Sequence, residues 1–199
     1  MHGEDFALEE GVPSFPDKSS LRADLRRLRR QLAAEAPAAP DRAAAGLPID
    51  RLPPFEVFSG YMPQGSEIDP NPLMRRLSAW GKPSLPAAFS WEEPLEFRLL
   101  GDVLEPDAFG IPSPPQEAEA VLPDLVITPL LAFDRSGGRL GQGAGHYDRA
   151  IANLRRCKPV FVLGLAYAGQ EMPQVPMEPH DQRLDAILTE TGYIEVKQG

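Results

Sequence analysis

Residues 124–154 constrain the fold of this chain most, because a strand pattern, a turn at Gly137-Gly138, a glycine-rich loop and the start of a helix follow one another there. The run LVIT (125–128) is short and apolar, which is typical of a strand buried on both faces of a parallel sheet. The glycine-rich sequence GQGAG (141–145) comes next, and a helical pattern begins near His146. Glycines let the backbone approach a ligand, and the first turn of a helix offers free N–H groups. This order predicts a phosphate site, although glycine spacing alone is equally typical of a tight turn without a ligand.

The rest of the chain alternates patterns typical of strands and helices. Strands are expected at 55–61, 83–89, 95–100, 124–128, 160–167, 186–189 and 193–196, and helices at 20–34, 41–45, 69–80 and from 146. In the helix at 69–80, we expect Leu73, Leu77 and Trp80 to face the core. Such alternation predicts an α/β fold, a single three-layer Rossmann-like domain with a mostly parallel central sheet and helices on both faces. This domain is expected over residues 18–199, after a flexible N-terminal arm at 1–17.

The charge balance limits the partners. The 199 residues carry a net charge of −9, from 29 acidic and 20 basic side chains. Nucleic acids and anionic membranes repel such a protein, so we expect neither as a partner. No apolar stretch is long enough to span a bilayer, no secretory signal is found, and we expect a cytoplasmic location. The single cysteine, Cys157, excludes an internal disulfide and is interpreted as structural.

An acidic protein that binds an anion needs a local source of positive charge. The helix expected at 20–34 has leucines at 21, 25, 28 and 32, and a second stripe of arginines at 22, 26 and 29. One interpretation is a surface helix with a solvated basic face. The other is that Lys18 and Arg22 are presented to a bound anion.

Three carboxylates follow predicted strands or lie close to the glycine loop. Glu67 comes after the strand at 55–61, Asp148 lies one turn into the helix that follows the loop, and Asp181 lies in a proline-flanked segment. Two carboxylates that face phosphate groups would suit Mg²⁺, which prefers oxygen ligands. The alternatives are a solvated Glu67 and an ordinary salt bridge of Asp148 with a nearby arginine. The three histidines do not have the spacing of a zinc site.

These residues together resemble the 5-formyltetrahydrofolate cyclo-ligases, also called methenyltetrahydrofolate synthetases, over about residues 18–196. The most specific part of the resemblance is the combination of AFD (132–134), RLG (139–141) and YDR (147–149). The supporting motifs occur in the family's order, and they are KSSLR (18–22), GSEID (65–69), FGIP (109–112) and His180-Asp181.

The resemblance implies an ATP- and Mg²⁺-dependent enzyme that closes 5-formyltetrahydrofolate to 5,10-methenyltetrahydrofolate and releases ADP and phosphate. Transfer of the γ-phosphoryl group to the formyl oxygen would turn that oxygen into a good leaving group for attack by N10. Such a reaction needs positioning and charge neutralisation more than covalent chemistry by the protein. The implied partners are a reduced folate and ATP, and the protein is expected to be a monomer.

The resemblance also implies roles for individual residues. ATP would be bound by Lys18, Ser19, Ser20, Leu21, Arg22, Arg139, Leu140, Gly141, Gln142, Gly143, Ala144, Gly145, His146 and Tyr147. The reacting groups would lie against Arg139, Gly143, Ala144, Gly145 and His146. The reduced folate would be bound by Met62, Glu67, Gln142 and His146, with Glu67 accepting hydrogen bonds from N–H groups of the pterin. Mg²⁺ would be held by Asp148 and Asp181.

Three positions depart from the family pattern. Family members often carry Lys or Gly where Ala144 stands, Tyr or Phe in place of His146, and Glu in place of Ser113. These departures leave open a second hypothesis, a protein of the same fold that binds nucleotide or folate without turnover. A third hypothesis, a sugar-phosphate isomerase of similar architecture, would need no ATP.

Overall fold

A central sheet of eight strands organises residues 18–197, which the computed structural model describes. The strand order is β12-β11-β10-β7-β1-β2-β3-β6. The strand bounds are β1 Val57–Ser59, β2 Lys82–Ala87, β3 Glu96–Leu99, β6 Ala120–Val121, β7 Leu125–Thr128, β10 Phe161–Leu165, β11 Ala186–Thr189 and β12 Gly192–Glu195. The five strands from β2 to β11 pair in parallel, and β12, β3 and β6 add antiparallel pairs at the two edges. The mostly parallel sheet expected from the sequence is therefore confirmed.

The order of the strands reverses between β1 and β7, and this reversal places helices on opposite faces. From β1 the chain passes through α3 (Asn71–Leu77) to β2 on one side, whereas from β7 it passes through α4 (His146–Cys157) to β10 on the other. Crossovers between parallel strands are right-handed, so opposite directions of travel put the two helices on opposite faces. Open sheets of this kind bind ligands beyond the carboxyl ends of the strands at the reversal.

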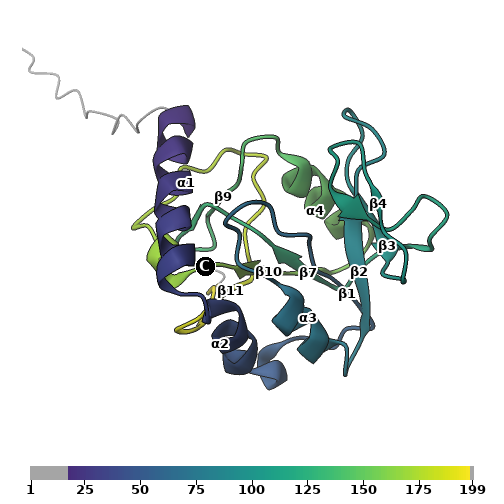
Figure 1. The fold of residues 1–199 in the computed structure, drawn as a ribbon, viewed down its shortest axis with the longest axis horizontal. Coiled ribbons are helices and arrows are strands. Elements are labelled where there is room, and N and C mark those ends of the chain that lie inside the picture. Colours follow the sequence, from purple (N-terminus) through teal and green to yellow (C-terminus); the bar gives the residue numbers. More distant parts are fainter. Residues whose placement is uncertain (1–17, 198–199) are drawn as a thin grey trace, which may run out of the picture.

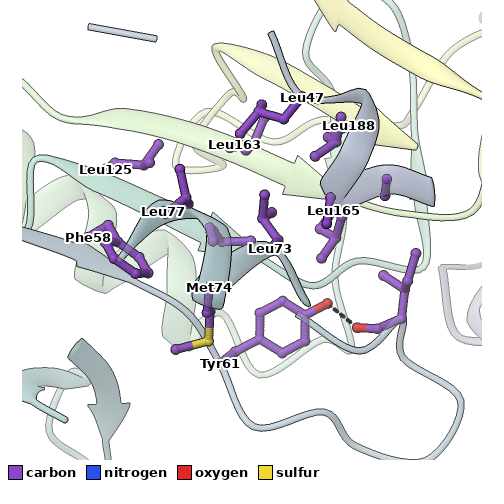
Figure 2. Packing of buried hydrophobic residues seen from close by; sticks show 14 of the residues in the cluster. Leu47, Phe58, Tyr61, Leu73, Met74, Leu77, Leu125, Leu163, Leu165 and Leu188 are labelled. Carbon is purple, nitrogen blue, oxygen red and sulfur yellow. Dashed lines mark hydrogen bonds between the residues drawn. The ribbon is translucent and has the colours of Figure 1, made fainter. Parts of the chain in front are cut away.

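Two hydrophobic clusters fill the space between the layers. On one face, α2 (Ala39–Gly46) and α3 pack on Phe58, Leu125 and Leu163, and on the other face α4 packs on Val126 and Val162. Figure 1 shows the strands between α4 on one side and α2 and α3 on the other. Figure 2 shows side chains of α3 among those of β7 and β10. Both faces of the sheet are covered, which confirms the expected three layers.

The longest helix, α1 (Lys18–Glu35), stands beside the sheet rather than within either helical layer (Figure 1). It packs Leu25 on a third cluster with Leu131, Leu140 and Val175. Residues 1–17, expected to form an arm, lie outside the described residues. The described chain also contains two small two-stranded sheets and two 3₁₀ turns, namely β4 (Glu105–Pro106) with β5 (Pro112–Ser113), β8 (Ala132–Phe133) with β9 (Arg139–Leu140), η1 (Ile49–Arg51) and η2 (Ala168–Gln170).

Two expectations from the sequence are wrong. Trp80 was expected on the inner face of its helix, but it is 54% exposed, because α3 ends at Leu77 and the chain then turns towards β2. Cys157, interpreted as structural, is an exposed free thiol at the last position of α4. None of the helices within residues 18–197 is long and apolar enough to cross a membrane.

Leu77→Ala should lower the free energy of unfolding by about 2–5 kcal/mol, because it removes a fully buried side chain and leaves a cavity. Trp80→Ala, three residues further on, should change it by no more than about 0.5 kcal/mol. Urea denaturation of the full chain measures both values. Equal losses in the two variants would contradict the packing of α3 described above.

Candidate active site

A cleft of about 730 Å³ opens beyond the carboxyl ends of β1 and β7, at the reversal of strand order. Its walls include Tyr61 and Met62, which follow β1, and Pro129 and Leu130, which follow β7. The glycine loop (141–145), the start of α4 and the segment 178–181 complete the lining. The glycine loop predicted as a site from the sequence therefore lies in the cleft that the topology favours for ligands.

The β8–β9 hairpin carries the chain from the sheet to the glycine loop, and Asp134 holds its turn. Oδ1 of Asp134 accepts hydrogen bonds from the amides of Ser136 and Gly138 and from the hydroxyl of Ser136, and Oδ2 accepts one from the amide of Val175. Burial alone would raise the pKa of Asp134, but these hydrogen bonds outweigh it and lower that pKa. The Asp of the AFD motif is thus a structural residue that directs the loop into the cleft.

Arg139 is the first residue of β9. Its side chain is buried, and its charge is paired with that of Asp148. Nη2 of Arg139 donates to Oδ1 of Asp148 at 2.8 Å, and the guanidinium also lies over the ring of Tyr147. The amide of Gln182 donates to the same oxygen of Asp148 at 3.0 Å. Within residues 18–197, Nε of Arg139 is buried without a hydrogen-bond partner. Asp148 therefore joins the glycine loop to the segment that contains Asp181.

Two arginines of α1 hold the glycine loop from outside. Nε of Arg22 donates to the carbonyl of Gly141 at 3.2 Å, and Arg26 donates to both the side chain and the carbonyl of Gln142. Gly143 has φ +112, and a Cβ at this position would lie 3.1 Å from the guanidinium carbon of Arg22. The backbone angle favours glycine here, and a side chain at this position would also push the guanidinium of Arg22 slightly away.

The amides of the loop remain available to a ligand. Gly145 precedes α4 with φ +66, and no side chain caps the helix. The N–H groups of Gly143, Ala144 and Gly145 donate to no other residue of the described chain. Unpaired amides beside a helix N-terminus attract negative charge. The loop therefore presents backbone donors, with Arg22 and Arg139 nearby, to one end of the cleft.

Aromatic rings line another part of the cleft. Trp91 contacts Phe109 edge-to-face with ring centroids 4.4 Å apart, and Phe109 contacts His146 in the same manner at 4.8 Å. Asp107 shapes the loop that carries Phe109, because its Oδ1 accepts hydrogen bonds from the amides of Phe109 and Ile111. A flat heterocycle fits such a wall through ring contacts and apolar burial.

The ring of His146 is held by Arg149. Nη2 of Arg149 lies 2.8 Å from Nδ1 of His146, and Nη1 donates to the carbonyl of Ala144 at 3.0 Å. A guanidinium can only donate, so Nδ1 accepts and the neutral ring carries its proton on Nε2. Burial and the charge of Arg149 lower the pKa of His146 from its ordinary value near 6.5, against the opposing charge of Asp107.

Glu67 is an acidic group of the cleft lining, and its side chain is 6% exposed. Its Oε1 pairs with Arg29 at 3.3 Å, and its Oε2 accepts the amide of Gln64 at 2.9 Å. Burial raises the pKa of Tyr61 and of Tyr147, and the charge of Glu67 adds to both shifts. These two phenols therefore stay neutral next to the carboxylate.

Glu178, His180 and Asp181 form a further cluster on the wall of the cleft. Their potential ligand atoms all lie within 4.8 Å of one another. Two carboxylates suit Mg²⁺, which uses one or two protein carboxylates together with phosphate oxygens and water. The residues present therefore fit a magnesium ion, and Glu178 is a candidate ligand that the sequence analysis did not include.

Most of the residues implied by the resemblance line this one cleft. They are Arg22, Met62, Glu67, Arg139, Leu140, Gly141, Gln142, Gly143, Ala144, Gly145, His146, Tyr147, Asp148 and Asp181. Ser19, Ser20 and Leu21 are not among the lining residues, since both serines are exposed and Leu21 packs against the cluster under α1. The side chain of Lys18 lies outside what the structure describes.

Sequence reasoning missed three further contributors, Trp91, Phe109 and the buried Arg29. In the sequence, Phe109 stands out only as part of the FGIP motif. A signal for Arg29 was present, because it continues the arginine stripe of α1, but nothing local shows which arginine of a stripe is buried.

His146 should titrate with a midpoint below 6.5, and Arg149→Gln should move that midpoint upward, because it removes a neighbouring positive charge. The chain has three histidines, so NMR titration of the ring protons can be assigned with a His146→Phe variant. Arg156→Gln on the same helix serves as the control and should leave the midpoint unchanged. A depressed pKa also means that the stability contributed by His146 is lost as pH falls from 6.5 through the folded-state value. A midpoint at or above 6.5 would show that the ring is not held as described.

Comparison with known proteins identifies the family of the chain. The family model of the 5-formyltetrahydrofolate cyclo-ligase family matches residues 14–190. A cyclo-ligase of Haemophilus influenzae is 40% identical over 99 residues, which are 47% of this chain and 52% of that protein. One of Mycolicibacterium smegmatis is 32% identical over 139 residues, which are 65% of this chain and 71% of that protein. The matched part of the chain thus spans about half the length of the Haemophilus relative.

Two solved structures with a similar fold are both methenyltetrahydrofolate synthetases. The 5,10-methenyltetrahydrofolate synthetase of Aquifex aeolicus superposes with a TM-score of 0.74 and 26% identity, covering 92% of this chain and 94% of that one. A second synthetase, from Mycoplasma pneumoniae, shares the fold with a TM-score of 0.67 at 23% identity, over 88% of this chain and 99% of that one. The extent of the family match, together with the shared fold, shows that this chain belongs to the 5-formyltetrahydrofolate cyclo-ligase family.

Proposed function

We propose that this chain converts 5-formyltetrahydrofolate to 5,10-methenyltetrahydrofolate, consuming ATP and releasing ADP and phosphate. The observation that carries the proposal is that one cleft is lined by two chemically different sets of groups, a polar half and an aromatic half. One half offers backbone amides and arginines, which suit a polyanion, and the other offers aromatic rings and a buried carboxylate, which suit a flat heterocycle with N–H groups. Family membership supports the same assignment.

In the polar half, the loop amides from Gly143 to Gly145 and the guanidiniums of Arg22 and Arg139 would hold the phosphates of ATP. The unpartnered Nε of Arg139 supports this placement, because a buried donor is costly unless an acceptor reaches it. In the other half, Met62 and Phe109 would pack on the pterin, and Glu67 would accept hydrogen bonds from its N–H groups.

The chemistry requires orientation and charge neutralisation. The formamide oxygen of the substrate is a poor leaving group until it receives the γ-phosphoryl group of ATP and ADP departs. N10 then attacks the formyl carbon and loses its proton, and the C–O bond breaks to release phosphate. Holding both substrates in one cleft supplies the positional advantage. Arg22 and Arg139 would stabilise the negative charge on the transferring group. The Nε2–H of His146 is a neutral donor on the same wall.

Magnesium would neutralise phosphate charge when bound, and Asp181 with Glu178 are the residues that we propose to hold it. Asp148 lines the same cleft and is a further candidate, although it is not part of that cluster. Asp148 has a second duty, because its Oδ1 already pairs with Arg139. A substitution at Asp148 would therefore also leave a buried arginine without its partner. Asp181 is the better position for a test. The monomeric state and the cytoplasmic location expected from the sequence remain predictions.

The second hypothesis, binding without turnover, is motivated by Ala144 and His146. The lining of the cleft argues against this second hypothesis, because the positive charge around the loop does not depend on a lysine at position 144. Arg22, Arg26 and Arg149 all contact the loop or its carbonyl groups from neighbouring positions.

The direct test supplies 5-formyltetrahydrofolate, ATP and Mg²⁺ to the purified chain and follows the absorbance of the methenyl product. We expect turnover that strictly requires both ATP and the divalent ion. A folded protein that binds ATP but forms no product would instead favour the non-catalytic hypothesis. Binding can be followed separately in a Trp80→Phe variant, where Trp91, in the cleft wall, is the only remaining tryptophan.

Asp181→Asn should raise the Mg²⁺ concentration needed for half-maximal turnover by roughly tenfold or more, because it removes a charged ligand. The dissociation constant for reduced folate should stay within about twofold, since Glu67 and the hydrogen bonds that hold it are unchanged. Asp24→Asn, at an exposed pair of α1 outside the cleft, is the matched control. An unchanged Mg²⁺ requirement would remove Asp181 from the metal site.

A further inference from the structure

Arg29 is a buried arginine on a helix whose basic side chains would ordinarily be exposed to solvent. It continues the stripe of Arg22 and Arg26 on α1, yet it is only 4% exposed. Burying a guanidinium is costly unless ionic and hydrogen-bonding partners replace the lost water. The partners of Arg29 therefore show what the burial achieves.

All three nitrogens of Arg29 are used. Nη1 donates to Oε1 of Glu67 at 3.3 Å and to the carbonyl of Leu130 at 3.2 Å. Nε donates to the hydroxyl of Ser66 at 3.2 Å, and Nη2 donates to the carbonyl of Gln64 at 3.5 Å. Four acceptors, three of them in the turn at 64–67, thus converge on one side chain.

Glu67 is held between two donors as a result. Arg29 binds one carboxylate oxygen, and the amide of Gln64 binds the other at 2.9 Å. Gln64 is itself fastened by Arg29 through its carbonyl. Within residues 18–197, Arg29 is the side chain that supplies positive charge to this carboxylate. Without it, Glu67 would be a buried anion next to two neutral phenols, those of Tyr61 and Tyr147.

We propose that Arg29 is the positioning residue for the reduced-folate half of the cleft, because it fixes the Glu67 carboxylate in the orientation that receives the N–H groups of the pterin. This inference rests on the proposed function, in which Glu67 binds the folate. Each carboxylate oxygen can accept more than one hydrogen bond, so the contacts with Arg29 and Gln64 leave capacity for a ligand. A purely structural arginine would fasten α1 without any particular effect on the folate.

Gln170 provides a matched control for the purely structural role. It is 2% exposed, and its Nε2 donates to the carbonyls of Leu130 and Leu131 at 2.9 and 3.0 Å. Gln170 thus shares the Leu130 carbonyl with Arg29, but none of its hydrogen bonds in the described chain reaches Glu67. Gln170→Met removes buried hydrogen bonds at the same place while leaving the carboxylate and its arginine intact.

The experiment compares Arg29→Met, Arg29→Lys, Glu67→Gln, Gln170→Met and the double variant Arg29→Met/Glu67→Gln in the full chain. Calorimetry gives the dissociation constants for 5-formyltetrahydrofolate and, separately, for ATP with Mg²⁺, and urea denaturation gives the stability. Arg29→Met should weaken folate binding by roughly 10- to 100-fold, because truncating one partner of a buried charge pair strands the other. ATP affinity should change by less than about twofold, since Arg22 and the glycine loop are untouched.

The remaining variants separate positioning from stability. Arg29→Lys should fall between wild type and Arg29→Met, because lysine keeps the charge but not the planar set of donors. Gln170→Met should lose stability but bind folate within about twofold of wild type. In the Glu67→Gln background, adding Arg29→Met should cost less than about twofold more, because the two residues act as one unit. If Arg29→Met does not fold, Arg29→Lys and its combination with Glu67→Gln carry the same comparison.

Two failures remain distinguishable. A wild-type chain that binds no 5-formyltetrahydrofolate overturns the proposed function, and this inference with it. A wild-type chain that binds, with Glu67→Gln weakened but the Arg29 variants matching Gln170→Met, overturns only the positioning role. Independent, multiplicative effects of Arg29→Met and Glu67→Gln on the folate dissociation constant would also overturn only the positioning role.

Discussion

The parallel pairing of β7 with both β1 and β10 is the constraint on which the rest of this structure depends. All four residues of β7 are buried, so the strand is covered on both faces and hydrogen-bonded along both edges. The chain after β7 therefore emerges at the carboxyl edge of the parallel strands. Because the neighbouring β1 ends at the same edge, the turns after both strands meet there, and the crossovers in opposite directions open a cleft between them.

Helix α1 supplies what the sheet alone cannot, a link between two parts of the cleft lining that lie far apart in the sequence, the glycine loop and Glu67. Arg22 and Arg29 are seven residues apart, which places them about 10 Å apart along the helix axis. Arg22 contacts the glycine loop at one end, and Arg29 contacts Glu67 at the other. Two turns of one helix therefore connect the polar half of the cleft with the half that carries the carboxylate. This explains how a protein with a net charge of −9 can still present local positive charge to a polyanion.

The features that could be predicted from the sequence are those with a local cause. The apolar run of β7, the glycine loop and the helix after it each have a pattern within a few residues, and the structure contains all three. The inward placement of Trp80 was wrong because the helical period was continued past Leu77, where α3 ends. The burial of Arg29 could not be predicted, since it is decided by Ser66 and Glu67, 37 and 38 positions away. The aromatic wall was missed for the same reason, because Trp91 and Phe109 meet only when two loops of the sheet edge come together.

Ala144, in the glycine loop, and His146, the first residue of α4, are surrounded by side chains that are fixed in place. A lysine at position 144 would be a mobile charge on the tip of the loop, whereas the cations here are held by defined acceptors, as Arg22 is by the carbonyl of Gly141. His146 is likewise not free to act as a cation, because Arg149 occupies its Nδ1 and disfavours its protonation. The loop therefore gains its positive field from surrounding arginines and keeps a neutral donor where it faces the aromatic wall. In the function proposed above, this division would place the arginine charge of the loop next to the phosphates of ATP and leave a neutral imidazole facing the reduced folate.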